Sequence, residues 1–272
     1  MRTIAIASGK GGTGKTTIAI NLTLALTKYG RQVILADGNF NNPNIGLMLG
    51  STKFEDTIFH AMDEDRNISE IVYKHQSGLK IIPGDISLEK IHKKDLVKFN
   101  DKLQDLKNNA EAVVIDTDSS FLHENVSLLK SIDSVIIVVT PDLISISESL
   151  KLLKLLKQGD NKTNVLGIVI NMKTNKEYDL SLKNIESILH EKIIGIIPYH
   201  DSIKHSLKIK FPVLYSHPDS KASAAFEKLA CNLIGKKYKD PKAEKPMTKM
   251  ESVMEKIGLK KWYETIIEDA ED

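Results

Sequence analysis

Glycine and lysine residues are concentrated in one short segment near the N-terminus. The segment Gly9–Thr16 matches the spacing G-x-x-x-x-G-K-[ST]. It follows the β-branched run Thr3–Ala7 and precedes a helical stretch, Thr16–Lys28, which Gly30 ends. In this context the backbone N–H groups of a tight loop can surround phosphate groups at the start of a helix, whose dipole favours negative charge. The pattern therefore predicts a strand, a phosphate-binding loop and a helix, in that order.

The same pattern assigns roles to individual residues of the loop. Lys15 is expected to reach the β- and γ-phosphates of ATP, and the Thr16 hydroxyl is expected to bind Mg²⁺. The other residues of the loop that we expect to contact the nucleotide are Gly11, Gly12, Thr13 and Gly14.

Composition and charge limit the classes of protein to which the chain can belong. With 272 residues, 41% hydrophobic and 27% charged, the chain is expected to fold around a sizeable core. The net charge of +2 gives no overall attraction for nucleic acid. The single cysteine, Cys231, excludes an intramolecular disulfide and a site built from several thiolates, and favours a reducing cytoplasm. We find no signal peptide and no apolar window approaching roughly 18 residues, so any membrane contact is expected to be peripheral.

Short apolar runs alternate with stretches of helical periodicity. Such alternation is typical of an α/β fold with a mostly parallel twisted sheet and helices on both faces, the fold class of P-loop nucleotide-binding proteins. We expect further helices at Phe121–Lys130 and Ser145–Lys157. The expected strands are Thr3–Ala7, Val33–Ala36, Leu79–Ile82, Ala112–Ile115, Ser134–Val139, Val165–Ile170 and Ile193–Ile197.

The C-terminal part of the chain differs in composition from the rest. We expect a nucleotide-binding domain over residues 1–235 and a flexible linker over residues 236–247, which is rich in Lys, Asp, Glu and Pro. Residues 248–272 are expected to form an amphipathic helix with an acidic tail. Its apolar stripe, lysines and Trp262 fit a helix at a membrane surface, or one packed on a partner or on its own domain.

A second lysine in the loop, Lys10, is not needed by an ordinary phosphate-binding loop. The segment Lys10–Thr17 resembles the deviant Walker A motif of the MinD/ParA family of ATPases, and Phe211–Phe226 is similar to the MinD branch. The resemblance implies that Lys10 and Thr17 also bind nucleotide, and that Lys10 does so by crossing the interface of an ATP-sandwiched homodimer to contact the partner's nucleotide.

Other segments extend the resemblance over most of residues 1–235. Val33–Asn39 with Pro43-Asn44 is similar to the family's switch I, and Val113–Thr117 to its Walker B strand. Asn171 and the run Pro198-Tyr199-His200 lie where the family holds adenine.

Several of these roles can also be argued from chemistry. Asp116 follows a buried strand beside the loop, where a carboxylate would hold a water on Mg²⁺. Asp37 ends its expected strand and is either structural or a second group near the metal. Asn171 offers both a donor and an acceptor, which suits adenine, but Asn is also common in turns.

Two departures from the family pattern concern hydrolysis. Asn39 stands where the resemblance implies an acid that orients the attacking water. An amide positions water but is a poor base, so hydrolysis is expected to be slow. The segment following Asp116 lacks the usual proline and glycine, and Asp118 is either a substitute for the missing acid or an exposed loop residue.

The sequence thus favours a MinD-like switch that dimerises on ATP, associates with a membrane or an unknown protein partner, and is reset by slow hydrolysis. One alternative is a nucleotide-sensing scaffold with negligible ATPase activity. Another is a ParA-like DNA-positioning ATPase, for which Lys204, Lys208 and Lys210 supply a small basic patch. The near-neutral charge makes DNA the weaker alternative.

Overall fold

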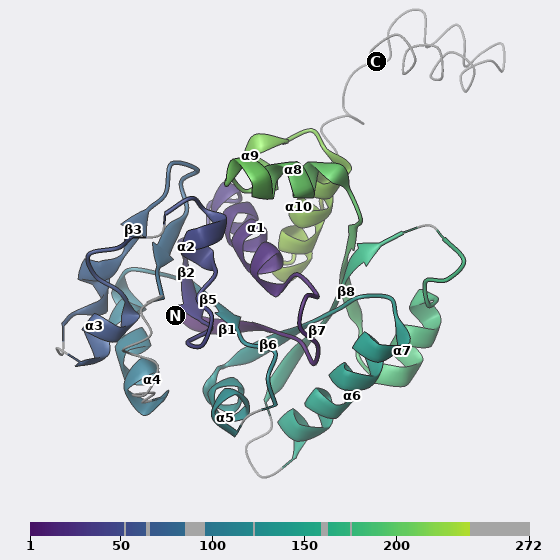
Figure 1. The fold of residues 1–272 in the computed structure, drawn as a ribbon, viewed down its shortest axis with the longest axis horizontal. Helices are drawn as coiled ribbons and strands as arrows, with labels where there is room; N and C mark the ends of the chain where they lie inside the picture. The colour runs from purple at the N-terminus through teal and green to yellow at the C-terminus, as the bar shows by residue number, and fades with distance from the viewer. Residues whose placement is uncertain are drawn as a thin grey trace, which may run out of the picture. The chain divides into compact units, whose positions relative to one another are not determined.

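The structure is a computed structural model, and it describes residues 1–239 except 52, 64–65, 85–95, 122, 159–162 and 175. Residues Met1–Lys236 form one compact unit, whose fold is drawn in Figure 1. The predicted C-terminal helix and acidic tail, and most of the predicted linker, lie outside the described residues.

An eight-stranded sheet lies at the centre of this unit, with the strand order β3-β4-β2-β5-β1-β6-β7-β8. All neighbouring strands are parallel except β3 and β4, which form an antiparallel pair. The strands are β1 (Arg2–Ala7), β2 (Val33–Gly38), β3 (Tyr73–Lys74), β4 (Lys80–Ile82), β5 (Ala112–Thr117), β6 (Ser134–Val139), β7 (Asn164–Lys173) and β8 (Ile193–Pro198).

Helices cover both faces of the sheet. Figure 1 shows α1 and α10 on one side and α5 and α6 on the other. The helices are α1 (Lys15–Lys28), α2 (Ile45–Met48), α3 (Ile58–Asp63), α4 (Leu96–Gln104), α5 (His123–Ser131), α6 (Leu143–Lys157), α7 (Leu182–Leu189), α8 (Asp201–Ile209), α9 (Val213–Ser216) and α10 (Lys221–Leu233), with 3₁₀ turns η1 (Ile68–Ile71) and η3 (Asp105–Asn108).

Two hydrophobic cores result, because successive side chains of a strand point to opposite faces. In β5, Val113 and Ile115 pack into the core with α4, α5 and α6, whereas Val114 packs into the core with α1 and α10. The central strands are apolar on both faces for this reason, which is why they read as continuous apolar runs in the sequence.

The structure confirms the predicted fold class. Every strand and helix predicted within residues 1–235 is present, with ends shifted by a few residues. One correction concerns Asp37, which does not end its strand, since β2 continues to Gly38. The sequence analysis did not predict β3, which is only two residues long, or the bounds of α2, α3, α4, α7, α8, α9 and α10. The shortest of these elements, β3, α2 and α9, carry too few residues to show a period.

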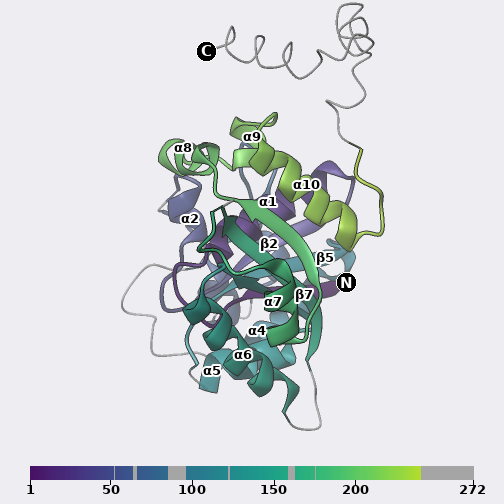
Figure 2. The same ribbon diagram turned by 90° about the vertical axis from the view of Figure 1, so that its right-hand side faces the viewer.

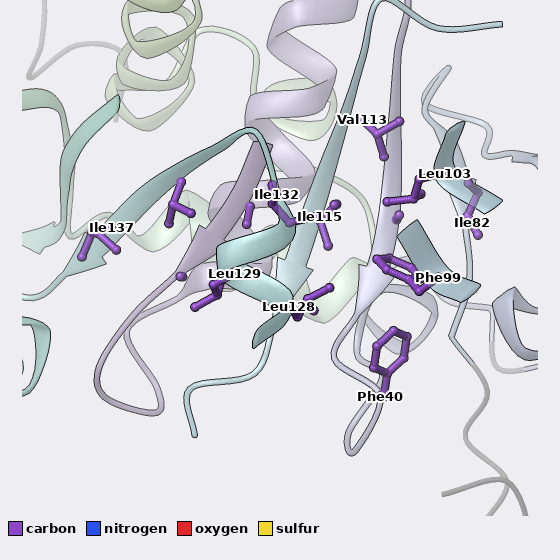
Figure 3. Close-up of a cluster of buried hydrophobic side chains, with 14 of the residues drawn as sticks. Phe40, Ile82, Phe99, Leu103, Val113, Ile115, Leu128, Leu129, Ile132 and Ile137 are labelled. Atoms are coloured by element: carbon purple, nitrogen blue, oxygen red, sulfur yellow. The ribbon is translucent and has the colours of Figure 1, made fainter. Parts of the chain in front are cut away.

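Phe40 anchors the loop that follows β2. It is 7% exposed and packs edge-to-face on Phe59 and Phe99, with ring centroids 5.6 Å and 5.1 Å apart. Figure 3 shows Phe40 beside Phe99 in this core. Because Asn39 directly precedes Phe40, these ring contacts also fix the position of Asn39.

We expect Phe40→Ala to lower the free energy of unfolding by about 3 kcal/mol, because it removes a buried ring and leaves a cavity. Phe121→Ala is the control, since Phe121 is 38% exposed, and we expect it to cost less than about 1 kcal/mol. Urea denaturation without nucleotide measures both. Equal losses for the two variants would contradict the anchoring role of Phe40.

Candidate nucleotide and metal site

The glycine-rich loop connects β1 to α1 at the carboxyl end of the sheet, and its glycines are required by geometry. Gly12 and Gly14 have φ angles of +76° and +88°, which strain any residue with a Cβ. A Cβ on Gly9 would lie 2.3 Å from the carbonyl carbon of Glu148 in α6. The loop is therefore pressed against a helix on one side and turns sharply on the other.

Lys15 lies inside this loop. Its Nζ donates a hydrogen bond to Ser8 Oγ at 3.0 Å, and Ser8 Oγ donates to the Lys10 carbonyl oxygen at 2.7 Å. Burial lowers the pKa of Lys15, although the nearby carboxylates of Asp116 and Asp118 act in the opposite direction. A buried ammonium beside a loop of N–H groups is well placed to bind phosphate oxygens.

Asp116 and Thr16 meet directly beside Lys15. Thr16 Oγ1 donates to Asp116 Oδ2 at 2.6 Å. The other carboxylate oxygen, Asp116 Oδ1, is buried without a hydrogen-bond partner, and so is the hydroxyl of Thr13 in the loop. Buried polar atoms without partners are costly in a folded protein. Thr16 and Asp116 therefore fit a Mg²⁺ ion with its waters, and the Thr13 hydroxyl fits a phosphate oxygen.

Asp37 lies next to Asp116, since the two residues are register partners in β2 and β5. It accepts hydrogen bonds from the Ile45 N–H at 3.1 Å and the Asn39 N–H at 3.2 Å. Burial raises the pKa of Asp37 well above its usual range, and the charge of Asp116 adds to this. Burial likewise raises the pKa of Asp116, to about 6. Two buried carboxyl groups on neighbouring strands favour a nearby cation.

Lys10 points away from this cluster. Its Nζ lies 3.4 Å from Asp142 Oδ1, and the two side chains are 38% and 44% exposed. Asp142 also caps α6 by accepting from the Ser145 N–H at 2.9 Å. Although burial raises the pKa of Asp142, hydrogen bonds and the charge of Lys10 give a net lowering. The two lysines of the loop thus occupy different environments.

Asn39 and Asp118 lie on the loops that follow β2 and β5. Asn39 Oδ1 accepts from the Asn42 N–H at 3.2 Å, so the side chain stabilises its own turn. Asp118 Oδ2 accepts from Asn41 Nδ2 at 3.2 Å, which joins the two loops. Burial alone would raise the pKa of Asp118, but the hydrogen bonds to its carboxylate outweigh burial and lower it. Asp118 is therefore ionised and held in place, although its role in hydrolysis stays a prediction.

The residues predicted to contact adenine lie at the ends of β7 and β8. Asn171 is buried and donates from Nδ2 to the Thr13 carbonyl oxygen at 2.7 Å, so it supports the phosphate loop. Pro198 ends β8 opposite Lys173, and Tyr199 is 50% exposed. His200 accepts the Ser202 N–H on Nδ1 and caps α8. The structure places these residues at the carboxyl ends of neighbouring strands, and their contact with a base stays a prediction.

Sequence reasoning missed three residues of this site, namely Ser8, Asn41 and Asp142. The pattern Asp142-x-x-Ser145 was a usable signal, because Asp followed by a helical stretch marks a helix start. Asn41 gave no signal, since its partner Asp118 lies 77 residues away in the chain. Ser8 lies just before Gly9, outside the loop pattern, so the pattern assigned it no role.

Comparison with known proteins adds independent evidence. A family model described as an AAA domain matches residues 1–166. An uncharacterized ATP-binding protein of Methanocaldococcus jannaschii is 34% identical over 235 residues, which cover 86% of this chain and 88% of that protein. The chain belongs to the MinD/ParA family of ATPases.

Solved structures of MinD proteins share the fold. The cell division ATPase MinD of Pyrococcus furiosus has a TM-score of 0.79 and 28% identity, and covers 86% of this chain and 98% of its own. MinD of Pyrococcus horikoshii, solved with Mg-ADP, has the same TM-score and identity over 89% and 97% of the two chains. In this protein, no helix among the described residues is both long and apolar enough to cross a bilayer.

The raised pKa of Asp116 predicts a pH dependence of Mg-ADP binding. A carboxylate that holds the hydrated metal must be ionised, and its pKa of about 6 lies within the accessible range. We expect the Kd for Mg-ADP to be nearly constant above about pH 7 and to rise by about tenfold per pH unit below about pH 6. The neighbouring Asp37 acts in the same direction. Calorimetry over this range, with ADP in EDTA as the control, measures the effect, and a Kd independent of pH would contradict it.

Proposed function

We propose that this protein is a MinD-type switch that binds ATP with Mg²⁺ and dimerises in response. The observation that carries the proposal is the separation of the two loop lysines. Lys15 occupies the interior of the loop beside Asp116, whereas the Lys10 ammonium lies at the surface against Asp142. A surface lysine on a phosphate loop can leave an exposed ion pair at small cost, since such pairs contribute about 0 to 1 kcal/mol. Lys10 is thus available to a nucleotide bound in a second subunit.

The surface around Lys10 supports this reading. Leu143, Ile144 and Met172 are 70%, 63% and 39% exposed, and the first two directly follow Asp142. Met172 and Asp142 both line a hollow of about 350 Å³ beside Lys10. Exposed apolar residues that lie together beside polar residues are typical of a protein interface. A second subunit placed on this face would bury them and bring its nucleotide towards Lys10.

The chain's own residues would bind and orient the nucleotide. The loop N–H groups and Lys15 would hold the phosphates, and Thr16 with Asp116 and Asp37 would hold the metal, which would neutralise charge on the β- and γ-phosphates. Asn39 is 8% exposed, and its oxygen is engaged by the Asn42 N–H. It can therefore place a water but cannot remove its proton efficiently, and we infer slow hydrolysis.

The proposed output is positioning at a peripheral membrane surface or on a protein partner, from a cytoplasmic pool. The C-terminal segment that would contact the membrane lies outside the described residues. Two weak membrane contacts in one dimer would gain roughly 10² to 10⁴ in avidity. Dimerisation alone would then control membrane residence.

Lys10→Ala tests the proposal. We expect the unmodified protein to sediment as a dimer with Mg-ATP and as a monomer with Mg-ADP, and the variant to stay a monomer with either. The ADP affinity of the variant should change by less than about threefold, because Lys10 does not contact its own phosphate site in this structure. Lys154→Ala is the control, since Lys154 is exposed on α6. An ATP-induced dimer of Lys10→Ala would contradict the proposal.

Asn39→Asp tests the inferred slow hydrolysis. A carboxylate retains the acceptor for the Asn42 N–H, so the turn is expected to keep its geometry while gaining a group that can attract the water's proton. We expect phosphate release to increase by about tenfold. Single-turnover assays with bound ATP measure it. A negligible rate in both proteins would favour the alternative, a nucleotide-sensing scaffold.

A further inference from the structure

A groove of about 1170 Å³ runs along the outer side of β8, and one end of it reaches Pro198, Tyr199 and His200, the residues predicted to contact adenine. Its walls are β8, the helix α10 and the segment that follows β7. The β8 side of the molecule faces the viewer in Figure 2. The apolar part of its lining includes Ile194, Ile196, Tyr199, Ala225 and Leu229.

β8 is the last strand of the sheet, and within the described residues no strand pairs with its outer side. An open strand edge presents backbone N–H and C=O groups that can pair with another extended chain. Two backbone groups of β8 already have side-chain partners, because the Ile193 N–H donates to Glu186 Oε1 at 2.9 Å and the Ile194 carbonyl oxygen accepts from Asn232 Nδ2 at 3.0 Å. The rest of the strand, from Gly195 to Pro198, offers an edge of about 13 Å. Ile196 is 38% exposed at this edge. This length and this apolar lining suit an extended peptide that adds one strand to the sheet.

The position of α10 beside this edge depends on close packing. A Cβ on Gly195 would lie 2.8 Å from Leu229 Cδ1, and Asn232 Nδ2 donates to the Ile194 carbonyl oxygen at 3.0 Å. These contacts hold the wall formed by α10 against β8. The wall of the groove is therefore held in place by specific contacts of the fold.

The lining of the groove is basic. It includes Lys173, Lys176, Lys221 and Lys228, and among the described residues it includes no Asp or Glu. Lys173 is neutralised by Asp179 behind it, at 2.9 Å. Lys176 and Lys221 are exposed and lie on different walls of the groove. The groove therefore favours an occupant that carries negative charge.

Charge and apolarity together decide between three occupants. Two copies of this chain paired through β8 would bring lysines against lysines, which costs energy. Nucleic acid would meet the lysines, but its backbone gains little from the aliphatic Ile194, Ile196 and Leu229. We propose that the β8 groove binds an extended segment of a partner protein that carries both apolar and acidic side chains and pairs with the edge of β8.

The proposal is tested on the full-length protein with Mg-ADP, so that it is independent of Lys10 and of dimerisation. The probe is a fluorescein-labelled synthetic peptide of sequence EVEIDVEI, measured by fluorescence anisotropy. We expect saturable binding to the unmodified protein and none for the reversed-charge peptide KVKIKVKI.

Substitutions in the groove test whether the peptide binds there. The double variant Lys176→Glu with Lys221→Glu should weaken binding of EVEIDVEI by at least about tenfold, and Ile196→Glu should do the same. Lys154→Glu is the matched charge reversal on α6, outside the groove, and should bind as the unmodified protein does. Unchanged ADP affinity and circular dichroism show that the variants are folded.

Other results would overturn the proposal. These are no binding of EVEIDVEI, equal binding of KVKIKVKI, or binding that the double variant and Ile196→Glu leave unchanged. Displacement of the peptide by a short DNA duplex whose binding requires Lys221 would assign the groove to nucleic acid. Self-association in ADP that Ile196→Glu abolishes would assign it to a second copy of the chain.

Discussion

Two carboxyl groups placed side by side at the carboxyl end of the sheet determine how the rest of the site is arranged. Asp37 and Asp116 are register partners in neighbouring parallel strands, and both are almost fully buried. Such a pair is unfavourable unless cations and donors compensate it. Lys15, the Thr16 hydroxyl and the N–H groups of Asn39 and Ile45 supply part of that compensation.

Some of the groups that compensate this pair lie on loops that are expected to move in a nucleotide switch. The two N–H groups that Asp37 binds belong to Asn39 in the loop after β2 and to Ile45 at the start of α2, so the charge state of the pair is linked to the position of Asn39. Asp118, two residues after Asp116, is connected to the same loop through Asn41. A cation bound at Asp116 would therefore change the electrostatic field on both loops. This linkage gives a physical route from metal binding to the loops that follow β2 and β5.

The sequence predicted most of the fold and the central residues of the site, for reasons visible in the structure. Strands buried on both faces are continuous apolar runs, and the loop glycines are needed for positive φ angles and close packing, so both leave signals in the sequence. Partners such as Lys10 and Asp142 lie 132 residues apart, and no local pattern joins them. The β8 groove was also not predicted, because an edge strand reads like any other apolar strand until its neighbours are known.

The central claim is that Lys10 acts on the nucleotide of the other subunit. It is tested most directly by mixing Lys10→Ala with Lys15→Ala and measuring ATP hydrolysis. A mixed dimer would have one complete site, with nucleotide held by Lys15 of the first variant and contacted by Lys10 of the second. The account predicts that the mixture hydrolyses ATP although neither variant does alone. A mixture no more active than its separate components would contradict it.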